Sequence, residues 1–126
     1  MSQMTFVLFF PDGSCGLVQS PDGGLGLPTG TLEAGEDELD ALVRIPLMAA
    51  GFRPQRFHPF RWAGSHLYAW VEGDRYDGHR PHRKVPLHVA PPEEASRSLR
   101  DQGRAADAAL VAAAARSYRD SLEHRA

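Results

Sequence analysis

The apolar residues of this chain fall into short runs that predict strands near its beginning and in its middle. Residues 5–10 (TFVLFF) form a continuous apolar, β-branched and aromatic run, which is typical of a central strand buried on both faces. In residues 65–72 alternate side chains separate into two sets, one with Leu67, Ala69 and Val71 and the other with His66, Tyr68 and Trp70. Neither set is polar throughout, so we expect each face of this strand to meet another layer. Shorter or weaker strands are predicted at residues 16–20, 25–27, 53–62 and 84–89.

The strand predicted for residues 53–62 contains Pro54 and Pro59. Proline cannot donate a backbone hydrogen bond to a neighbouring strand, so it is confined to edge strands and irregular positions. We therefore expect this strand to be broken or to lie at an edge of the sheet. Ala63 and Gly64 would join it to the strand at residues 65–72.

A first helix is predicted after residue 36, because Leu39, Leu42 and Val43 recur at spacings of three and four. Gly51 stands where a glycine commonly ends a helix. Inside this segment Pro46 removes one backbone hydrogen bond and clashes with the preceding turn, at a cost of about 3 kcal/mol. We therefore expect a kink or an early helix end near residues 43–45.

Two further helices are predicted in the last third of the chain. Prolines and acidic residues at positions 91–94 suit a first turn, and Gly103 would end that helix. The segment 105–125 is rich in alanine and carries an apolar stripe made of Leu110, Ala114, Tyr118 and Leu122. Strands, a helix, strands and then helices in this order indicate an α/β sandwich with a mixed sheet. A length of 126 residues with 42% hydrophobic content predicts one domain, residues 1–126.

Composition excludes several classes of partner. The net charge is −2, so there is no bulk electrostatic attraction for nucleic acid. No apolar run approaches the ~20 residues that a membrane span requires, and the N-terminus lacks a basic segment of the signal-peptide type. The single cysteine, Cys15, cannot form an internal disulfide. These features predict a cytoplasmic protein with a small-molecule ligand and no nucleic-acid or membrane partner.

The segment 25–52 resembles the Nudix box of the Nudix hydrolase superfamily, whose pattern is G-x5-E-x7-R-E-U-x-E-E-x-G-U with U a bulky apolar residue. The matching positions here are Gly30, Glu36, Arg44, Gly51 and Phe52, with the usual lead-in Leu27-Pro28-Thr29 before them. The resemblance implies a Nudix-like α/β/α sandwich in which a salt bridge between Glu36 and Arg44 fixes the loop against the helix. Since Nudix proteins often dimerise, it is also compatible with a homodimer.

The box departs from the family at the residues that hold magnesium. The three glutamates of the family's Arg-Glu-U-x-Glu-Glu segment are replaced by Ile45, Met48 and Ala49. None of these side chains offers the hard oxygen that Mg²⁺ prefers. We therefore predict no metal cofactor, although carboxylates such as Glu33 and Glu36 leave a weak Mg²⁺ site open. Their alternative role is to cap the helix and to carry ordinary surface charge.

Three side chains of the strand at residues 65–72 form the candidate pocket. His66 is the candidate acid or base, because imidazole titrates near neutral pH, and Glu33 and Glu36 would assist it. Tyr68 and Trp70 would stack a planar ligand, and His58 would lie nearby. The alternative is that this aromatic face is plain core packing. A cluster of basic residues after the strand would bind an anionic group or else form a solvated loop; its candidate ligand residues are Arg75, Arg80 and Arg83.

Two classes of function remain open. The degenerate box favours a small-molecule enzyme of altered, metal-independent chemistry, a non-standard Nudix hydrolase. The first alternative is a catalytically inactive domain that binds a nucleotide or another small ligand and has a regulatory role. The second alternative is a weak, magnesium-dependent hydrolase of nucleoside-diphosphate-type substrates.

Overall fold

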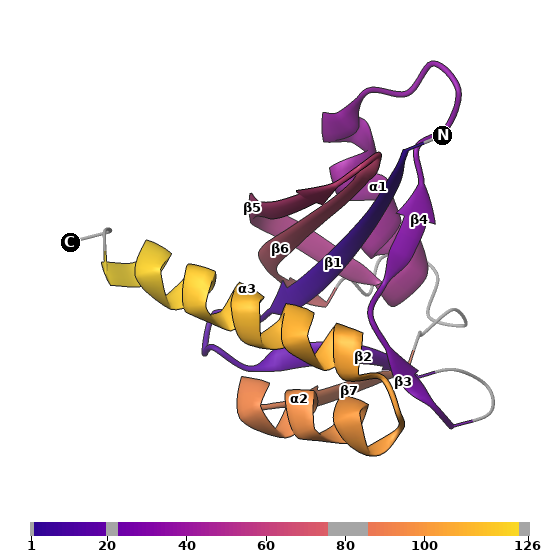
Figure 1. Ribbon diagram of the computed structural model, residues 1–126. Helices are drawn as coiled ribbons and strands as arrows, with labels where there is room; N and C mark the ends of the chain where they lie inside the picture. The colour runs from indigo at the N-terminus through magenta and orange to yellow at the C-terminus, as the bar shows by residue number, and fades with distance from the viewer. Residues whose placement is uncertain (1, 20–22, 76–85, 124–126) are drawn as a thin grey trace.

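The computed structural model describes residues 2–19, 23–75 and 86–123, and these form one mixed sheet with helices on both of its faces (Figure 1). The sheet of this part has seven strands, which are β1 (Gln3–Phe9), β2 (Cys15–Gln19), β3 (Leu25–Gly26), β4 (Thr29–Thr31), β5 (Phe52–Ala63), β6 (His66–Arg75) and β7 (Leu87–Ala90). The three helices described with it are α1 (Glu38–Ala50), α2 (Pro92–Asp101) and α3 (Ala105–Glu123). The predicted α/β class with a mixed sheet is confirmed.

Strand β1 is the centre of the sheet because it pairs on both sides. It runs parallel to β6 along its whole length, and β6 forms an antiparallel hairpin with β5. On its other side β1 pairs antiparallel with β4 at its beginning and with β2 at its end. Strand β2 then carries β3 and β7. The sheet twists strongly, so that β2 and β7 lie across the direction of β1 and β6 (Figure 1).

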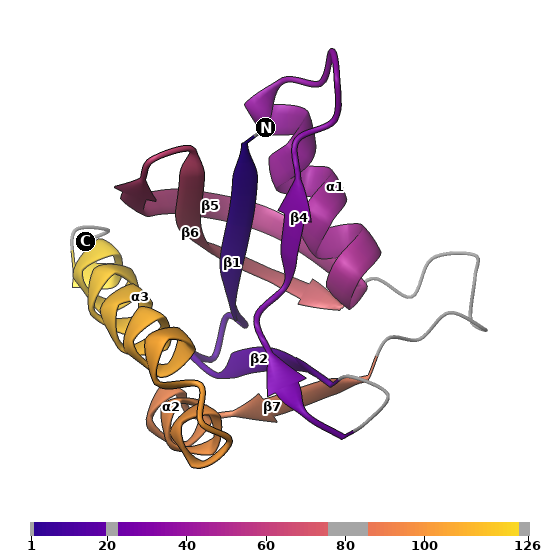
Figure 2. The ribbon, with the colours of Figure 1, turned by 45° about the vertical axis from the view of Figure 1, so that its right-hand side comes forward.

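The two faces of the sheet hold separate apolar clusters. On one face α1 packs its buried residues Leu42 and Ile45 against a cluster that includes Phe6, Leu8 and Val71. On the other face α2 and α3 cover a second cluster, which includes Phe9, Leu17, Trp70, Leu99, Val111 and Tyr118. Figure 2 shows α1 on one side of the sheet and the two later helices on the other. The clean alternation predicted for residues 65–72 is confirmed, since Leu67, Ala69 and Val71 join the first cluster and Trp70 the second.

The early end predicted for the first helix is wrong, because α1 continues through Pro46 to Ala50. Pro46 is itself buried, and so are Leu42, Ile45 and Ala50 on the same side of the helix. Each fully buried large apolar side chain contributes about 1.5–3 kcal/mol, and several of them together outweigh the ~3 kcal/mol cost of an internal proline. The ends of α1 are well defined. The Asp37 side chain accepts a hydrogen bond from the Asp40 N–H, and Gly51 ends the helix in a left-handed conformation with a φ of 59°.

Strand β5 lies at the edge of the described sheet, as its prolines predict. Its pairing with β6 shifts register twice, between Pro54 and Arg56 and again between Pro59 and Arg61. At each shift one extra residue of β5 is left without a partner on β6, which is the definition of a β-bulge. The prediction that this strand is irregular and peripheral is thus confirmed.

Two strand assignments differ from the prediction. Residues 29–31 form β4, a strand that the hydrophobic pattern does not predict because it is short and shows no alternation. The last strand, β7, runs from Leu87 to Ala90, and the beginning of the predicted strand at residues 84–85 lies outside the described residues. In the described part of the chain, no helix is long and apolar enough to cross a membrane.

Candidate functional site

The loop before α1 is held by a bidentate pair between Arg44 and Glu36. Arg44 donates from Nε to Glu36 Oε2 at 2.7 Å and from Nη2 to Glu36 Oε1 at 2.9 Å. Arg44 Nη2 also reaches the carbonyl of Thr31 at 2.8 Å, which ties β4 to the helix. The Glu33 N–H donates to Glu36, and the Glu33 carboxylate lies 3.6 Å from the same guanidinium. The predicted pairing of Glu36 with Arg44 is confirmed.

This geometry explains the charge state of the pair. Hydrogen bonds from Arg44 and then from the Glu33 backbone N–H lower the pKa of Glu36 below its ordinary value. The same carboxylate raises the pKa of Arg44. Only 12% of the Glu36 side chain is exposed, so both of its oxygens are committed to the loop rather than open to a ligand. Glu36 is therefore a structural residue in this fold.

Glycine at position 30 has a packing reason in this structure. A Cβ at Gly30 would stand 2.8 Å from Ile45 Cγ1, so β4 and α1 approach more closely than any other residue would allow. Ile45 therefore packs closely against the sheet. At this position the resemblance implies a magnesium ligand instead.

The residues present do not fit the magnesium site that the resemblance implies. Ile45 is buried against the sheet, and Met48 and Ala49 offer no oxygen. Both carboxylate oxygens of Glu36 are hydrogen-bonded to Arg44. The carboxylate of Glu33 is exposed and lies 3.6 Å from Arg44, so of the two it is the one more open to a ligand. Among the described residues, no group of three histidine, cysteine or acidic side chains is arranged to hold a metal ion.

His66 and Tyr68 lie together on the face of the sheet that carries α3. Their rings stack with centroids 4.2 Å apart and planes 4° from parallel. His66 Nε2 lies 2.7 Å from Thr5 Oγ1 on β1, and Thr5 Oγ1 lies 3.0 Å from Thr29 Oγ1 on β4. Thr5 is buried although it is polar, and these two contacts satisfy its hydroxyl. No hydrogen bond or ion pair among the described residues joins His66 to Glu33 or Glu36, so the structure does not bring together the three residues predicted as catalytic.

Trp70 belongs to the core, and its predicted role in ligand stacking is corrected. It is 1% exposed, and its indole N–H donates to Ser117 Oγ on α3 at 2.9 Å. The rings of Phe9 and Tyr118 meet it edge-on, at centroid distances of 6.4 Å and 5.2 Å. Trp70 is buried beneath α3, whereas His66 and Tyr68 are partly exposed, so this face of β6 is core at one end and partly open at the other.

An ion pair that the sequence does not reveal lies next to Trp70, with Glu72 buried and Arg56 partly buried. Arg56 donates from Nε to Glu72 Oε1 at 3.0 Å, and Tyr118 donates its hydroxyl to Glu72 Oε2. The Arg56 guanidinium also lies 5.2 Å from the centre of the Trp70 ring, a cation–π arrangement. These contacts join β5, β6 and α3, so this cluster anchors the last helix to the sheet.

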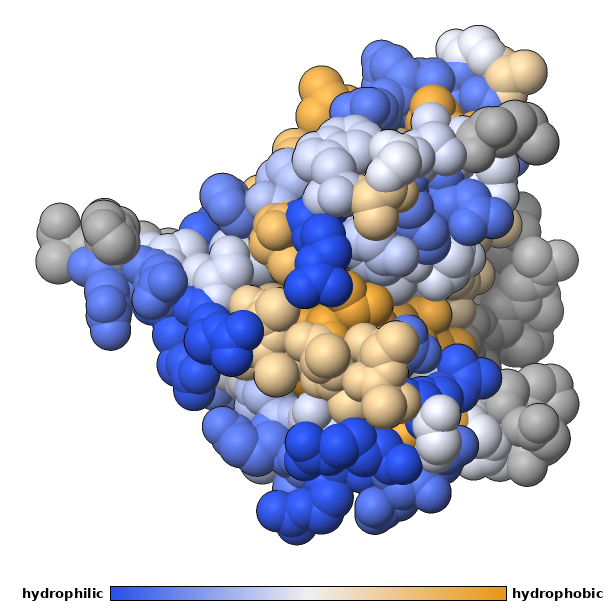
Figure 3. All heavy atoms as spheres, viewed as in Figure 1, coloured by the Kyte–Doolittle hydropathy of each residue, from blue (hydrophilic) through white to orange (hydrophobic). Residues whose placement is uncertain are grey.

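An open groove of about 850 Å³ runs between β5 and α3. Its β5 wall carries aromatic rings and a cation, and its α3 wall carries small and polar residues with one carboxylate. The lining residues are His58, Pro59, Phe60, Arg61, Trp62, Ala113, Ser117, Asp120 and Ser121. His58, predicted as a ligand contact, lies in this groove, with its ring centroid 5.7 Å from that of Trp70. In Figure 3 hydrophobic residues gather where α3 meets the sheet, and hydrophilic residues gather at the lower end over α2.

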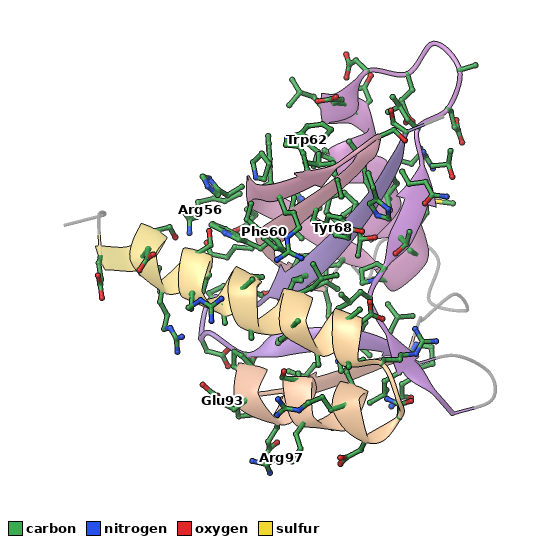
Figure 4. All side chains as sticks on the ribbon, in the orientation of Figure 1. Arg56, Phe60, Trp62, Tyr68, Glu93 and Arg97 are labelled. Atoms are coloured by element: carbon green, nitrogen blue, oxygen red, sulfur yellow. The ribbon has the colours of Figure 1, made fainter. Side chains whose placement is uncertain are left out.

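The second bulge of β5 brings the groove next to Tyr68. Pro59 is opposite Ala69 and Arg61 is opposite Tyr68, so Phe60 is the extra residue. Because two successive residues oppose one partner in a bulge, Phe60 and Arg61 both stand beside Tyr68. Figure 4 shows Phe60 and Tyr68 side by side on the sheet above α3, with Trp62 farther along the edge strand. The density of aromatic and basic residues in residues 56–62 (RFHPFRW) was the signal that could have located this wall.

The predicted basic cluster is described only at its beginning. Arg75 is exposed at the end of β6, where its N–H donates to the Asp74 side chain. Arg80 and Arg83 lie outside the described residues. The anion-binding role predicted for these three residues stays a prediction.

No protein-family model matches this chain, and no curated protein sequence matches it significantly. The structure defines the class of the molecule, an α/β protein with a mixed sheet between helices.

Proposed function

We propose that this chain is a Nudix-like domain with a degenerate box, and that it binds a planar small molecule with an anionic group in the groove between β5 and α3. The observation that carries the proposal is the groove itself, with exposed aromatic rings and a cation on one wall. Ligand sites are typically concave, largely apolar and supplied with a few polar groups that fix orientation.

Three local features support a Nudix-like arrangement. Glu36 and Arg44 form the loop-to-helix pair that the resemblance implies. Gly30 permits the close approach of β4 to α1, and Gly51 ends the helix at the expected place. These are scaffold positions. They support a shared architecture, whereas the positions that would hold metal carry apolar side chains.

The groove walls suit a flat ring with a negative charge. Phe60 is partly buried against the cluster beneath α3, and His58 is exposed on the same wall, so their rings offer an aromatic surface for stacking. Trp62 lies at the rim of the groove, because it is opposite Leu67, whose side chain joins the cluster on the α1 face. Arg61 is exposed and has no ion-pair partner among the described residues, so its planar fork is available for a carboxylate or a phosphate. Ser117 accepts the Trp70 N–H through Oγ, so its own hydroxyl hydrogen can point into the groove.

A second candidate function is metal-independent acid–base chemistry on the bound molecule. The observation that favours it is His66, whose ring is fixed by Thr5 and Tyr68 beside the residues that flank the groove. Imidazole exchanges protons near neutral pH, which is the requirement for a general acid or base. The groups that would assist it in this structure are hydroxyls rather than the acidic loop.

The proposal is tested by a thermal-shift screen with nucleoside phosphates and aromatic carboxylates, followed by calorimetry on the ligands that stabilise the protein. A ligand present at about 100 times its Kd stabilises the native state by roughly 2.7 kcal/mol. Stacking of one ring is worth about 1–3 kcal/mol, so Phe60→Ala should weaken binding roughly 5- to 150-fold. Arg61→Ala should lose a charge-assisted hydrogen bond, which is worth about 1.5–3 kcal/mol.

Two control variants keep the comparison specific. Phe57→Ala removes an exposed aromatic from the same strand, but Phe57 pairs with Val71 on the face that carries α1. Arg97→Ala removes an exposed arginine from α2, well away from the groove (Figure 4). Both controls should bind like the wild type. If Phe60→Ala and Arg61→Ala also bind with unchanged affinity, the groove is not the site.

A further inference from the structure

A chain of hydroxyl groups leads from His66 across the sheet to a backbone carbonyl. His66 Nε2 contacts Thr5 Oγ1 at 2.7 Å, and Thr5 Oγ1 contacts Thr29 Oγ1 at 3.0 Å. Thr29 Oγ1 then donates to the Leu27 carbonyl at 3.4 Å. The chain joins β6, β1 and β4, which are adjacent strands.

The carbonyl at the end of this chain fixes its direction. A carbonyl oxygen only accepts, so the Thr29 hydroxyl hydrogen is used on Leu27. Thr29 must then accept from the Thr5 hydroxyl, and Thr5, having donated its single hydrogen, must accept from His66. This order of donors would place the proton of the neutral His66 ring at Nε2.

The other ring nitrogen is left as an acceptor. A neutral imidazole with its proton at Nε2 has a lone pair at Nδ1. The two ring nitrogens point in diverging directions, so Nδ1 points away from β1, and β5 flanks β6 on that side. His66 is paired there with Ala63, which has no polar side chain, and within the described residues no hydrogen bond reaches Nδ1. The parallel stack with Tyr68 holds the ring in this orientation.

We propose that Thr5 and Thr29 are positioning residues that hold His66 as its Nε2–H tautomer and present Nδ1 as the hydrogen-bond acceptor of the ligand site. The ligand it selects carries an N–H or O–H donor on its planar ring, in addition to the anionic group that Arg61 would bind. This statement about the ligand rests on the proposed function. The tautomer does not, because it is a property of the protein without ligand.

The tautomer is measured directly by ¹⁵N NMR of the histidine rings in the free full-length chain, at about pH 8.5, where imidazole is neutral. For His66 we expect Nε2 to resonate as a protonated nitrogen and Nδ1 as an unprotonated one. In Thr5→Val and in Thr29→Val the two resonances should move toward each other, because the tautomers then exchange. Thr5→Ser, which keeps the hydroxyl, should restore the wild-type values.

Thr31→Val is the matched control, since Thr31 lies on the same strand but contributes only its backbone carbonyl, to Arg44. It should leave the His66 resonances unchanged. A proton at Nδ1 in the wild type, or an unaltered tautomer in Thr5→Val with its folded spectrum intact, would overturn the proposal. A ligand from the screen that binds in the groove and shifts only Nε2 would overturn the statement about the ligand while leaving the groove itself in place.

Discussion

Replacing Trp70 by alanine tests whether the buried end of β6 is core rather than pocket. The ring is 1% exposed and has a partner on every side, including Phe9, Tyr118 and His58. Large-to-small changes at such aromatic positions cost about 3–5 kcal/mol. Because neighbours enclose the ring on all sides and cannot collapse into the space that alanine would leave, we expect a loss of stability near the upper end of that range.

This loss should be large compared with the stability of the whole protein. Single domains are stable by only about 5–15 kcal/mol. With an unfolding entropy of about 2.1 cal/mol/K per residue over 126 residues, each kcal/mol lowers the melting temperature by roughly 4 °C. The variant should therefore melt about 16–20 °C below the wild type.

The assay is urea unfolding followed by far-UV circular dichroism, with the melting temperature from calorimetry. Trp62→Ala is the control, because this is the other tryptophan of the chain and it is 56% exposed. If Trp70→Ala does not fold, Trp70→Phe keeps most of the ring and removes only the N–H that Ser117 accepts. A loss of about 0.5 kcal/mol or less in Trp70→Ala, the size expected at an exposed site, would refute the core assignment.

Five further outcomes are expected. Arg44→Ala should melt at a lower temperature than the wild type, because it strands the nearly buried Glu36 carboxylate. The pKa of Glu36 is lowered in the folded protein, so the ionised carboxylate stabilises the fold above the ordinary carboxyl pKa of 4.5, and this contribution is lost as the pH falls below it. The melting temperatures of Glu36→Gln and of the wild type, measured as a function of pH, should therefore become equal in acid. Gly73→Ala should cost about 3 kcal/mol in urea unfolding, since its Cβ would stand 2.0 Å from the Arg53 carbonyl oxygen. Burial raises the pKa of Cys15 to about 12, so iodoacetamide at neutral pH should label the thiol only after unfolding, as read by mass spectrometry. Titration calorimetry with Mg²⁺ should show no micromolar binding, because the box helix offers no oxygen ligands at the substituted positions.

Local patterns predict much of this fold because they depend on nearest neighbours. The alternation in β6 assigns its residues to the two faces of the sheet, and Pro54 and Pro59 place β5 at an edge, since both rules concern the geometry of a strand itself. The pair of Glu36 and Arg44 is likewise found from spacing, because the loop and the helix it joins are adjacent in sequence.

Features that depend on tertiary packing escape such patterns. The helix α1 passes through Pro46 because the sheet buries its flanking residues, and helix propensity carries no information about that burial. The groove needs the bulge at Phe60 and the placement of α3, which are set by residues about 50 positions apart in the chain. The ion pair of Arg56 with Glu72 and the hydroxyl of Tyr118 are invisible for the same reason.

Strand β5 is 12 residues long and lies at the edge of the described sheet. A regular edge of that length would offer another chain a continuous row of backbone donors and acceptors on which to add a strand. Pro54 and Pro59 each lack a backbone N–H, and each stands at a shift of register, so the row is interrupted twice. The irregularity that turns Phe60 and Arg61 toward the groove therefore also makes this edge a poor template for growth of the sheet from one molecule into the next.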